Sequence, residues 1–456
     1  MIKNRSELLS HGFIKGREKA LDIAEHALRQ VDPLAAVKRY VNLDGNMLQV
    51  NEDVFNLNKV NKIYAIGAGK ATYPLAVALE EILGDRITDG FIAIKKGQKN
   101  PFFDMLGTLS RIRVAESAHP VPDETSLAAG KEIWRIADKA GIGDMVFCLM
   151  SGGVSAQSVY PVEGLSFNDK VTINQLLVHC GADVTEIMTV RRHLSRIKGG
   201  RLAPRMLPAT VISLTVSDEK TDSMEWNTDW TSPDSSTLAD AEKVLKKYGL
   251  WQNVSAQVRN YLSTPTPEKE TPKSFPNEPL HYCMVVKTRE LWQGAAKKSK
   301  ELGLSPILLT TLLNGESREV GRTIASIANE IKLSGNPIRP PCTLIATGET
   351  AVRIQAGASG RGGANQELAA GACLDLDGKD PIVICALDTD GTDGPTSLAG
   401  AITDGSTKIR AAEKGYDLYR MLMKHDIATT LKATGDAVVT GPTGTNVNDL
   451  VVCVVL

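Results

Sequence analysis

The chain has 456 residues, of which 42% are hydrophobic and 23% charged, with a net charge of −1. The length and composition indicate a globular protein of at least two domains. The near-zero charge and the 5% of aromatic residues exclude the basic field and stacking surface of a nucleic-acid binder, and a membrane partner is not expected either. No apolar stretch reaches the about 18 residues that span a bilayer. Seven cysteines without a CxxC pair indicate a reduced, cytoplasmic protein.

Apolar strand-like runs alternate with helical segments through the first half of the chain. Residues 5–40 have helical spacing of apolar side chains. Strands are predicted at 62–66, 90–94, 145–150 and 211–216, and helices at 71–83, 126–140, 169–180 and 184–194. This alternation predicts an α/β domain with a parallel, Rossmann-like sheet and helices on both of its faces.

A proline-rich stretch between Tyr261 and Leu280 interrupts this series. Proline has no N–H and favours extended geometry in the residue before it, so neither a helix nor a central strand is expected there. A second series follows, with strands near 281–286, 305–311, 342–346, 382–386 and 450–456. The sequence therefore predicts one domain over 1–262, a linker over 263–280 and a second α/β domain over 281–456.

Two glycine-rich loops follow predicted strands of the first domain. One carries Gly67, Gly69 and Lys70 before a helix, and the other carries Ser151, Gly152, Gly153 and Ser155. Glycine lets backbone N–H groups approach an anion, and a helix N-terminus adds positive potential. Neither loop is a Walker A or GxGxxG motif. An anion site and an ordinary tight turn therefore both remain open for each loop.

Charged residues gather in two further places of the first domain. The segment 189–201 holds six basic residues, counting His193, among them Arg191 and Lys198. A local phosphate site and a solvated helix face both explain such a run. Asp218 and Asp222 follow the strand at 211–216, where one or two carboxylates typically hold Mg²⁺ together with substrate phosphates.

Carboxylates follow the strand at 382–386, in the segment 387–396 with Asp390 and Asp393. Ligands of α/β sheets bind at the carboxyl ends of strands, although Asp-Gly pairs are also ordinary turn chemistry. Glu349 follows another strand, and a glycine-rich loop with Arg361 precedes Asn365 and Glu367. Glycine, hydroxyl, carboxylate and a few cationic groups at strand ends are typical of phosphoryl transfer, where positioning and charge neutralisation dominate catalysis.

These loops together resemble the glycerate 2-kinase family, whose members carry a glycerate-kinase amino-terminal region and a MOFRL-type carboxyl-terminal domain. Some relatives are labelled hydroxypyruvate reductase. The similar motifs extend over nearly the whole chain: 67–71, 119–123, 151–153, 190–195, 197–203, 347–350, 362–363 with 365–367, 390–396 and 444–449.

The resemblance implies two α/β domains with the active site in the cleft between them. It implies ATP- and Mg²⁺-dependent transfer of the γ-phosphoryl group to the 2-hydroxyl of D-glycerate or a closely related hydroxy or sugar acid. Lys70, Asp390, Asp393 and Arg191 are then the expected catalytic residues. Phosphate binding is expected from Gly67, Gly69, Ser151, Gly152, Gly153, Ser155 and Lys198, metal binding from Asp218 and Asp222, and substrate binding from His119, Glu349, Arg361, Asn365 and Glu367.

The chain departs from the family pattern at several of these loops. Val154 stands where a third glycine is usual, and Ala364 where an arginine is usual. The segment 219–232 is altered and brings in Trp226 and Trp230. These departures bear on both ATP and Mg²⁺ binding, because glycines allow backbone approach and an arginine clamps anions. Arg361, Arg191 or Arg192 could supply the missing charge.

Three functions stay open on the sequence. The first is a glycerate 2-kinase or a kinase for a related acid. The second is an isomerase, lyase or oxidoreductase acting on a small sugar acid, with Lys70 and the aspartates in proton transfer. The third is a ligand-binding relative with weak catalysis. No Rossmann fingerprint supports a nicotinamide site, and a two-fold symmetric homodimer is the default expectation for the assembly.

Overall fold

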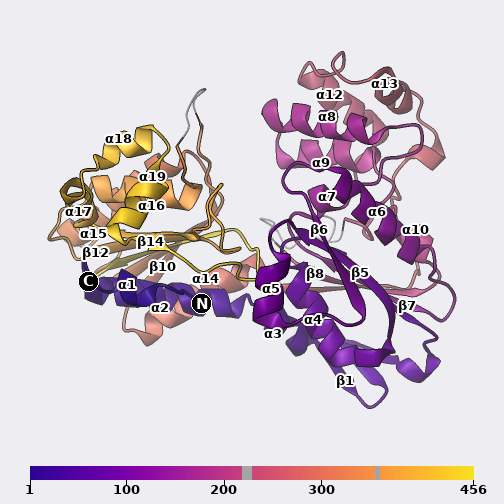
Figure 1. Cartoon of the computed structure of the whole chain (residues 1–456), viewed down its shortest axis with the longest axis horizontal. Coiled ribbons are helices and arrows are strands. Elements are labelled where there is room, and N and C mark those ends of the chain that lie inside the picture. The colour runs from indigo at the N-terminus through magenta and orange to yellow at the C-terminus, as the bar shows by residue number, and fades with distance from the viewer. Residues whose placement is uncertain (218–228, 355–359) are drawn as a thin grey trace. The chain divides into compact units, whose positions relative to one another are not determined.

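The computed structural model describes residues 1–217, 229–354 and 360–456. The chain forms two compact units, one of residues Pro33–Val285 and the other of Met1–Asp32 with Val286–Leu456. The first 32 residues of the chain therefore belong to the same unit as its carboxyl-terminal part (Figure 1). The units do not coincide with the predicted division at 262 and 281. The predicted Asp218 and Asp222 lie outside the described residues.

The unit of residues 33–285 is built on a six-stranded sheet in the order β6-β5-β4-β7-β8-β9. The pairs among β4 to β8 are parallel, as predicted. Tyr64, Ile66 and Ala68 of β4 pack with α6 in one hydrophobic cluster, and the alternate residues of the strand face the opposite side. The strands are β4 (Ile63–Ala68), β5 (Ile87–Lys95), β6 (Ile112–Ser117), β7 (Met145–Met150), β8 (Thr210–Val216) and β9 (Leu280–Val286).

Helices and a small antiparallel sheet surround this core. The small sheet consists of β1 (Val41–Asp44), β2 (Met47–Val50) and β3 (Asp53–Asn56). The helices are α3 (Pro33–Tyr40), α4 (Thr72–Leu83), α5 (Lys99–Leu106), α6 (Glu124–Ala137), α7 (Val154–Gln157), α8 (Phe167–His179), α9 (Val184–His193), α10 (Ala203–Met206), α12 (Leu238–Lys247) and α13 (Ala256–Ser263). The residues just before α8, α9 and α12 are Ser166, Asp183 and Thr237. Their side chains accept backbone N–H groups of the first helical turn, as N-cap residues usually do.

The proline-rich segment does not connect the two units. It contains only the short turn η3 (Pro267–Lys269), and Pro279 accepts a hydrogen bond from the backbone of Val211 in β8. The segment leads into β9, which lies at the edge of the first sheet and was predicted to open the second. The physical reason is that the pairing of a strand depends on long-range contacts, which its local sequence does not encode.

The other unit contains a second six-stranded sheet, in the order β10-β11-β15-β12-β13-β14. Only β10 and β11 pair in parallel, and the remaining pairs are antiparallel, so this sheet is mixed. Its strands are β10 (Ser305–Leu313), β11 (Cys342–Gly348), β12 (Ile382–Asp388), β13 (Gly400–Asp404), β14 (Ala437–Val438) and β15 (Asp449–Val455).

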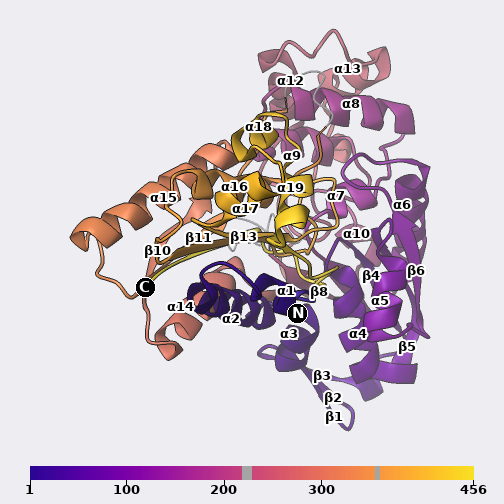
Figure 2. The same cartoon turned by 60° about the vertical axis from the view of Figure 1, so that its left-hand side comes forward.

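Helices cover both faces of the mixed sheet. On one face α15 (Ser317–Ser334) and α16 (Ala364–Leu374) share a hydrophobic cluster with β11, β12 and β15, joined by α17 (Thr407–Glu413), α18 (Leu418–Met423) and α19 (Ile427–Thr434). On the other face α2 (Ile14–Gln30) packs beside α14 (Thr288–Glu301), and both contact the strands. Figures 1 and 2 show this pair beneath the sheet, opposite α15 and α16.

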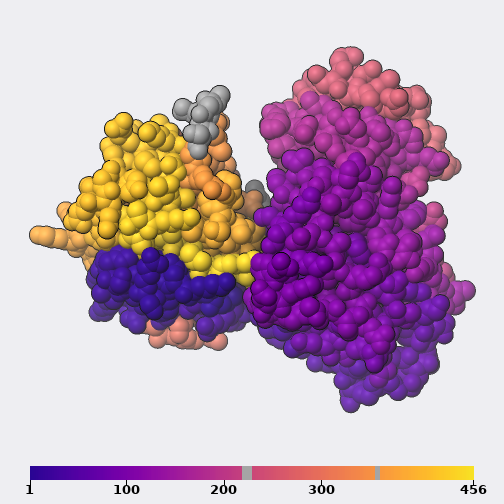
Figure 3. Space-filling model, in the orientation of Figure 1, coloured from indigo at the N-terminus to yellow at the C-terminus, as the bar shows by residue number. Residues whose placement is uncertain are grey.

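The amino-terminal segment is bound firmly to this unit. Asn4, just before α1 (Arg5–Leu8), bridges the backbone of β14 by donating to Ala437 at 2.8 Å and accepting from Val439 at 3.0 Å. The space-filling view shows the indigo amino-terminal segment lying along the yellow carboxyl-terminal part (Figure 3). Residues more than 400 positions apart in the sequence thus form one folding unit.

Arg17 of α2 makes the main polar contact between these segments. Its side chain is fully buried, and it donates to Asp404 at 2.5 Å and to Asp436 at 2.7 Å. Burial by itself raises the pKa of Asp436, but the hydrogen bond with His11 and the charges of Arg17 and Arg410 outweigh it and hold that pKa at about 2. The carboxylates are therefore ionised and paired at neutral pH.

Replacing Arg17 with methionine should destabilise this unit by about 3–5 kcal/mol, because it removes the fully buried cation from Asp404 and Asp436 and leaves them with the partly exposed Arg410. Arg5→Met provides the matched control. Arg5 pairs with Asp22 and Glu25, but its side chain is 28% exposed, so its loss should cost only about 0–1 kcal/mol. Urea unfolding at pH 7 measures both. Equal effects of the two substitutions would show that burial does not set the contribution of the Arg17 ion pairs.

Candidate active site

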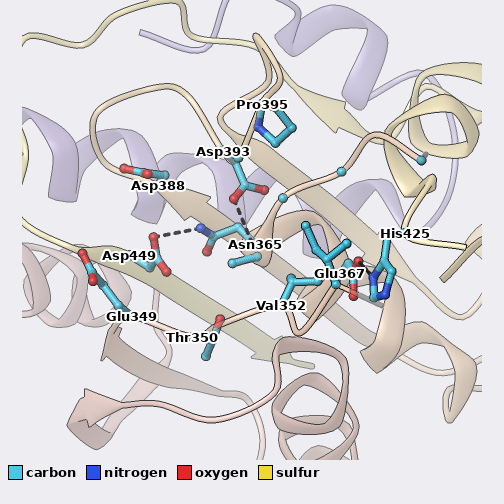
Figure 4. A pocket seen from close by; sticks show the side chains of 16 residues that line it. Glu349, Thr350, Val352, Asn365, Glu367, Asp388, Asp393, Pro395, His425 and Asp449 are labelled. Carbon is cyan, nitrogen blue, oxygen red and sulfur yellow. Dashed lines mark hydrogen bonds and ion pairs between the residues drawn. The ribbon is translucent and has the colours of Figure 1, made fainter. Parts of the chain in front are cut away.

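A pocket of about 300 Å³ lies at the end of the mixed sheet where β11, β15 and β12 meet (Figure 4). In the antiparallel register, Asp449 at the start of β15 stands opposite both Gly348 at the end of β11 and Asp388 at the end of β12. The register therefore brings the start of one strand to the ends of two others. The wall is completed by the start of α16, the loop 393–395, His425 and residues 349–354.

Four of the predicted site residues line this pocket. They are Glu349, Asn365, Glu367 and Asp393. Asp388, Asp449 and His425 also line it and were not predicted as site residues. Asp388 and Asp449 lie within predicted motifs, whereas no signal in the sequence around His425 marks it.

Asp393 holds the beginning of α16. Its carboxylate accepts the backbone N–H of Asn365 at 3.2 Å and that of Gln366 at 2.9 Å, together with the side-chain amide of Gln366 at 3.0 Å. A Cβ on Gly363 would lie 2.2 Å from the carboxyl carbon of Asp393, so only glycine fits there. Burial raises the pKa of Asp393 to about 6, even though these hydrogen bonds favour the ionised form.

Two further buried acids surround the first turn of α16. Asp449 accepts the side-chain amide of Asn365 at 2.8 Å, and burial together with the charge of Asp388 raises its pKa well above the usual range. Glu367 lies 2.8 Å from Nδ1 of His425. Burial also raises the pKa of Glu367, partly offset by the contact with His425. The pocket therefore concentrates acidic groups that resist ionisation.

Asp390 and Arg361 lie near this pocket but do not line it. Asp390 is buried and accepts the backbone N–H and the hydroxyl of Thr392 at 2.8 and 2.7 Å, so it shapes its own turn. Arg361 is exposed, and its guanidinium donates to the carbonyl of Pro395 at 3.2 Å. Of the two aspartates predicted as catalytic, Asp393 alone reaches the pocket wall.

The two glycine-rich loops of the other unit lie against each other. The backbone N–H of Lys70 donates to Gly152 at 2.9 Å, and that of Ala71 donates to the hydroxyl of Ser151 at 2.9 Å. A Cβ on Gly69 would lie 2.2 Å from the same hydroxyl, so the close approach requires glycine. Gly67 belongs to β4 and is buried against β7. The loops predicted from separate parts of the sequence thus form one structure.

Several hydrogen-bond donors of this paired loop are unused. Within the described residues, no acceptor is seen for the backbone N–H groups of Gly152 and Gly153. The buried hydroxyl of Ser155 and the buried side-chain amide nitrogen of Gln157 also lack partners. His119 lies beside Gly153, where an added Cβ would be 3.2 Å from its ring. Donors without acceptors suit an anion, and Gln157 is the member that the sequence did not reveal.

The departures at Val154 and Trp230 do not obstruct this loop. Val154 begins α7 and its N–H closes the turn to Ser151 at 3.2 Å, while Gly153 adopts the left-handed φ of 93°. Trp230 is fully buried in the hydrophobic cluster with Ile197 and Met206. Trp226 lies outside the described residues.

The basic residues at 189–201 make internal contacts. Lys198 is buried and donates to the carbonyl of Ser158 at 2.8 Å, and burial lowers its pKa to about 8. Arg191 donates to Asn174 at 2.9 Å, and Arg192 pairs with Asp229 at 2.9 Å. Lys198 thus bonds to the backbone just after the loop at 151–157, and the segment is not a solvated helix face.

Asp393→Asn removes the ionisable carboxyl group, so comparing this variant with the wild type shows how the titration of Asp393 affects stability. In the folded state its pKa is about 6, above the value of about 3.9 in an unfolded chain. Between these values the folded state holds a proton that the unfolded state has lost, so this group's contribution to stability falls as pH rises through 6. The stability of the wild type relative to Asp393→Asn should therefore decrease by roughly 2 kcal/mol from pH 4 to pH 8. Urea unfolding of both proteins across this range measures it, and a constant difference would contradict the raised pKa.

The sequence matches known protein families and known enzymes over most of its length. A family model described as a domain of unknown function, DUF4147, matches residues 19–263, and the MOFRL family model matches residues 342–449. A D-glycerate 2-kinase of Thermotoga maritima is 36% identical over 439 residues, which cover 96% of this chain and 97% of the relative. A glycerate 2-kinase of Pyrococcus horikoshii is 37% identical over 443 residues, covering 96% and 97%.

A solved structure matches the fold along the same length. A crystal structure of a glycerate kinase from Thermotoga maritima has a TM-score of 0.80 and 36% identity, and it covers 96% of this chain and 99% of its own. Among the described residues, none of the helices is both long and apolar enough to span a membrane. The chain therefore belongs to the glycerate 2-kinase family and is an enzyme of the kinase type.

Proposed function

We propose that this enzyme transfers the γ-phosphoryl group of ATP, with Mg²⁺, to the 2-hydroxyl of D-glycerate or a closely related hydroxy acid. The observation that carries the proposal is the set of unused donors in the paired glycine-rich loops, in a chain that covers its glycerate 2-kinase relatives almost completely. The cytoplasmic location, the homodimer and the site between the two domains stay predictions.

The donors of the paired loops fit the phosphates of a nucleotide. The N–H groups of Gly152 and Gly153, the Ser155 hydroxyl and the Gln157 amide would bind phosphate oxygens, and each gains a hydrogen bond that it otherwise lacks. Lys70 adds a full positive charge at the start of α4. Bound ATP supplies the phosphoryl group, and the chain positions it and neutralises its charge.

In this proposal a buried carboxylate of the pocket accepts the proton of the substrate hydroxyl. A general base works best with a pKa near the operating pH, and the pKa of about 6 places Asp393 in that range. Asp449 and Glu367, whose pKa values are also raised, are positioned to hold the substrate. These assignments require that the substrate hydroxyl reaches the pocket wall.

Lys70→Ala should lower the rate of ADP formation with D-glycerate by roughly 10²–10³-fold, because it removes the charge that stabilises the transferred phosphoryl group. Lys96→Ala is the control, since Lys96 is an exposed lysine of the same unit paired with Asp123 and should leave the rate unchanged. A coupled ADP assay measures both. Turnover of a sugar acid without ATP would favour the alternative, an isomerase, lyase or oxidoreductase in the same fold.

Magnesium dependence tests the two aspartates that the sequence assigns to the metal. Removing Mg²⁺ with EDTA should abolish phosphoryl transfer, and adding Mg²⁺ should restore it. Asp218→Asn and Asp222→Asn should each raise the Mg²⁺ concentration for half-maximal rate at least tenfold, because hard oxygen ligands carry the affinity. An unchanged requirement in both variants would remove these residues from the metal site.

A further inference from the structure

The unsatisfied polar atoms in the wall of the mixed-sheet pocket are hydrogen-bond acceptors. The side-chain oxygen of Asn365 and one carboxyl oxygen of Glu367 are buried without a partner, and each residue is only 1% exposed. The amide nitrogen of Asn365 is already used, since it donates to Asp449 at 2.8 Å (Figure 4). A ligand that satisfies this wall must therefore bring donors.

The acidic composition of the pocket wall also favours a ligand that brings hydrogen-bond donors and no negative charge. Five carboxyl groups line the pocket: Glu349, Glu367, Asp388, Asp393 and Asp449. Among the lining residues in the described part of the chain there is no lysine or arginine, and Ala364 stands at the first position of α16. A carboxylate or phosphate of the ligand would meet no lysine or arginine among these lining residues, and its charge would oppose the ionisation of the carboxyl groups still further, which is unfavourable at short range.

Among the described residues, the acidic side chains of the wall do not form a cage that holds a metal ion by protein ligands alone. In the described ranges, no group of three or more histidine, cysteine or acidic side chains has the spacing to hold one. The remainder of the wall is apolar, formed in part by Val352, Ile354 and Pro395. Apolar side chains beside buried acceptors suit a carbon chain that carries hydroxyl groups.

We propose that this pocket binds the hydroxyl-bearing tail of a polyhydroxylated acid, with hydroxyl groups donating to Asn365 and Glu367 and with the ligand's carboxylate outside the pocket. The identification of this acid as the phosphoryl acceptor rests on the proposed function. The pocket of about 300 Å³ has room for a chain longer than the three carbons of glycerate. The substrate class is thus the aldonic acids of four or five carbons.

Substrate preference is the first test. In the coupled ADP assay with Mg·ATP, one of the four- or five-carbon aldonic acids, assayed as a panel of stereoisomers, should have a kcat/KM at least tenfold above that of D-glycerate. Asn365→Ala should remove this advantage by lowering kcat/KM for the longer acid at least tenfold more than it lowers kcat/KM for D-glycerate, because it deletes one acceptor for the tail. A preference for D-glycerate over the entire panel would overturn the proposal.

Binding in the absence of nucleotide separates the pocket from the kinase reaction. Calorimetric titration of the full chain with erythritol, threitol and ribitol should detect binding of at least one polyol, weakened at least tenfold in Asn365→Ala. Polyol binding without phosphoryl transfer to any acid would refute the kinase and retain the pocket assignment. Transfer to D-glycerate without polyol binding and without a preference for longer acids would refute the pocket assignment alone.

Ala364 provides a matched pair of variants. Ala364→Arg adds a cation to the wall, and Ala364→Leu adds bulk without charge. The ratio of D-glycerate to polyol affinity should rise at least tenfold in the arginine variant and stay within about threefold in the leucine variant. Equal ratios in both variants would show that charge does not determine what the pocket admits and would overturn the proposal.

Discussion

The burial of Arg17 between Asp404 and Asp436 is the constraint on which the unit with the acidic pocket depends. A buried guanidinium is tolerated only when its donors are used, and two buried carboxylates are tolerated only with a cation between them. This ion pair holds α2 against the sheet, next to α14 and on the face opposite α16. The sheet is thus covered on both faces. Polar side chains gather where β11 and β12 end and β15 begins. The acidic pocket lies at that end of the sheet.

The glycine-rich loops and the acidic pocket differ in the kind of polar atom that they leave unsatisfied. The glycine-rich loops of residues 33–285 leave donors, namely two backbone N–H groups, a hydroxyl and an amide nitrogen. The pocket of the other unit leaves acceptors, on Asn365 and Glu367. Buried polar groups are normally paired, so each set marks a surface that a ligand completes. A nucleotide brings anionic oxygens and a polyhydroxylated acid brings hydroxyl donors, which matches one reactant of the proposed reaction to each set.

Sequence patterns predicted those elements whose character is local. Strands such as β7 and β12 are continuous apolar runs and were found within a few residues, as were the helices α4 and α9. Among the strands that were missed, β3 and β6 are only partly buried and lack such runs. The place of β9 in the first sheet and the packing of the amino-terminal helices on the carboxyl-terminal unit were also missed. Both depend on contacts between distant residues.

Contacts between distant segments also decide which single residues reach the pocket, so the sequence could not predict all of them. Asp390 and Asp393 look equivalent in the sequence, since each is followed by glycine in one short loop. Asp393 reaches the pocket because Gly363, which comes from a distant part of the chain, has no Cβ to displace its carboxylate. Asp390 instead bonds to Thr392 within its own turn. Likewise, Glu367 was predicted, but its partner His425 belongs to another segment and could be found only in three dimensions.

The two single-residue departures from the family pattern have different physical consequences. At Val154 the backbone has an ordinary conformation and its N–H already closes a turn, so a glycine there would add freedom that the loop does not use. At Ala364 the side chain begins α16 in the wall of the acidic pocket. An arginine at that position would place a full charge among five carboxyl groups, and alanine places none. The donor loop that suits phosphate is therefore preserved, while the charge that the pocket presents to the other reactant has changed. Under the proposed function, a change confined to the acidic pocket would alter which acid is accepted and would leave the donors of the glycine-rich loops in place for a nucleotide.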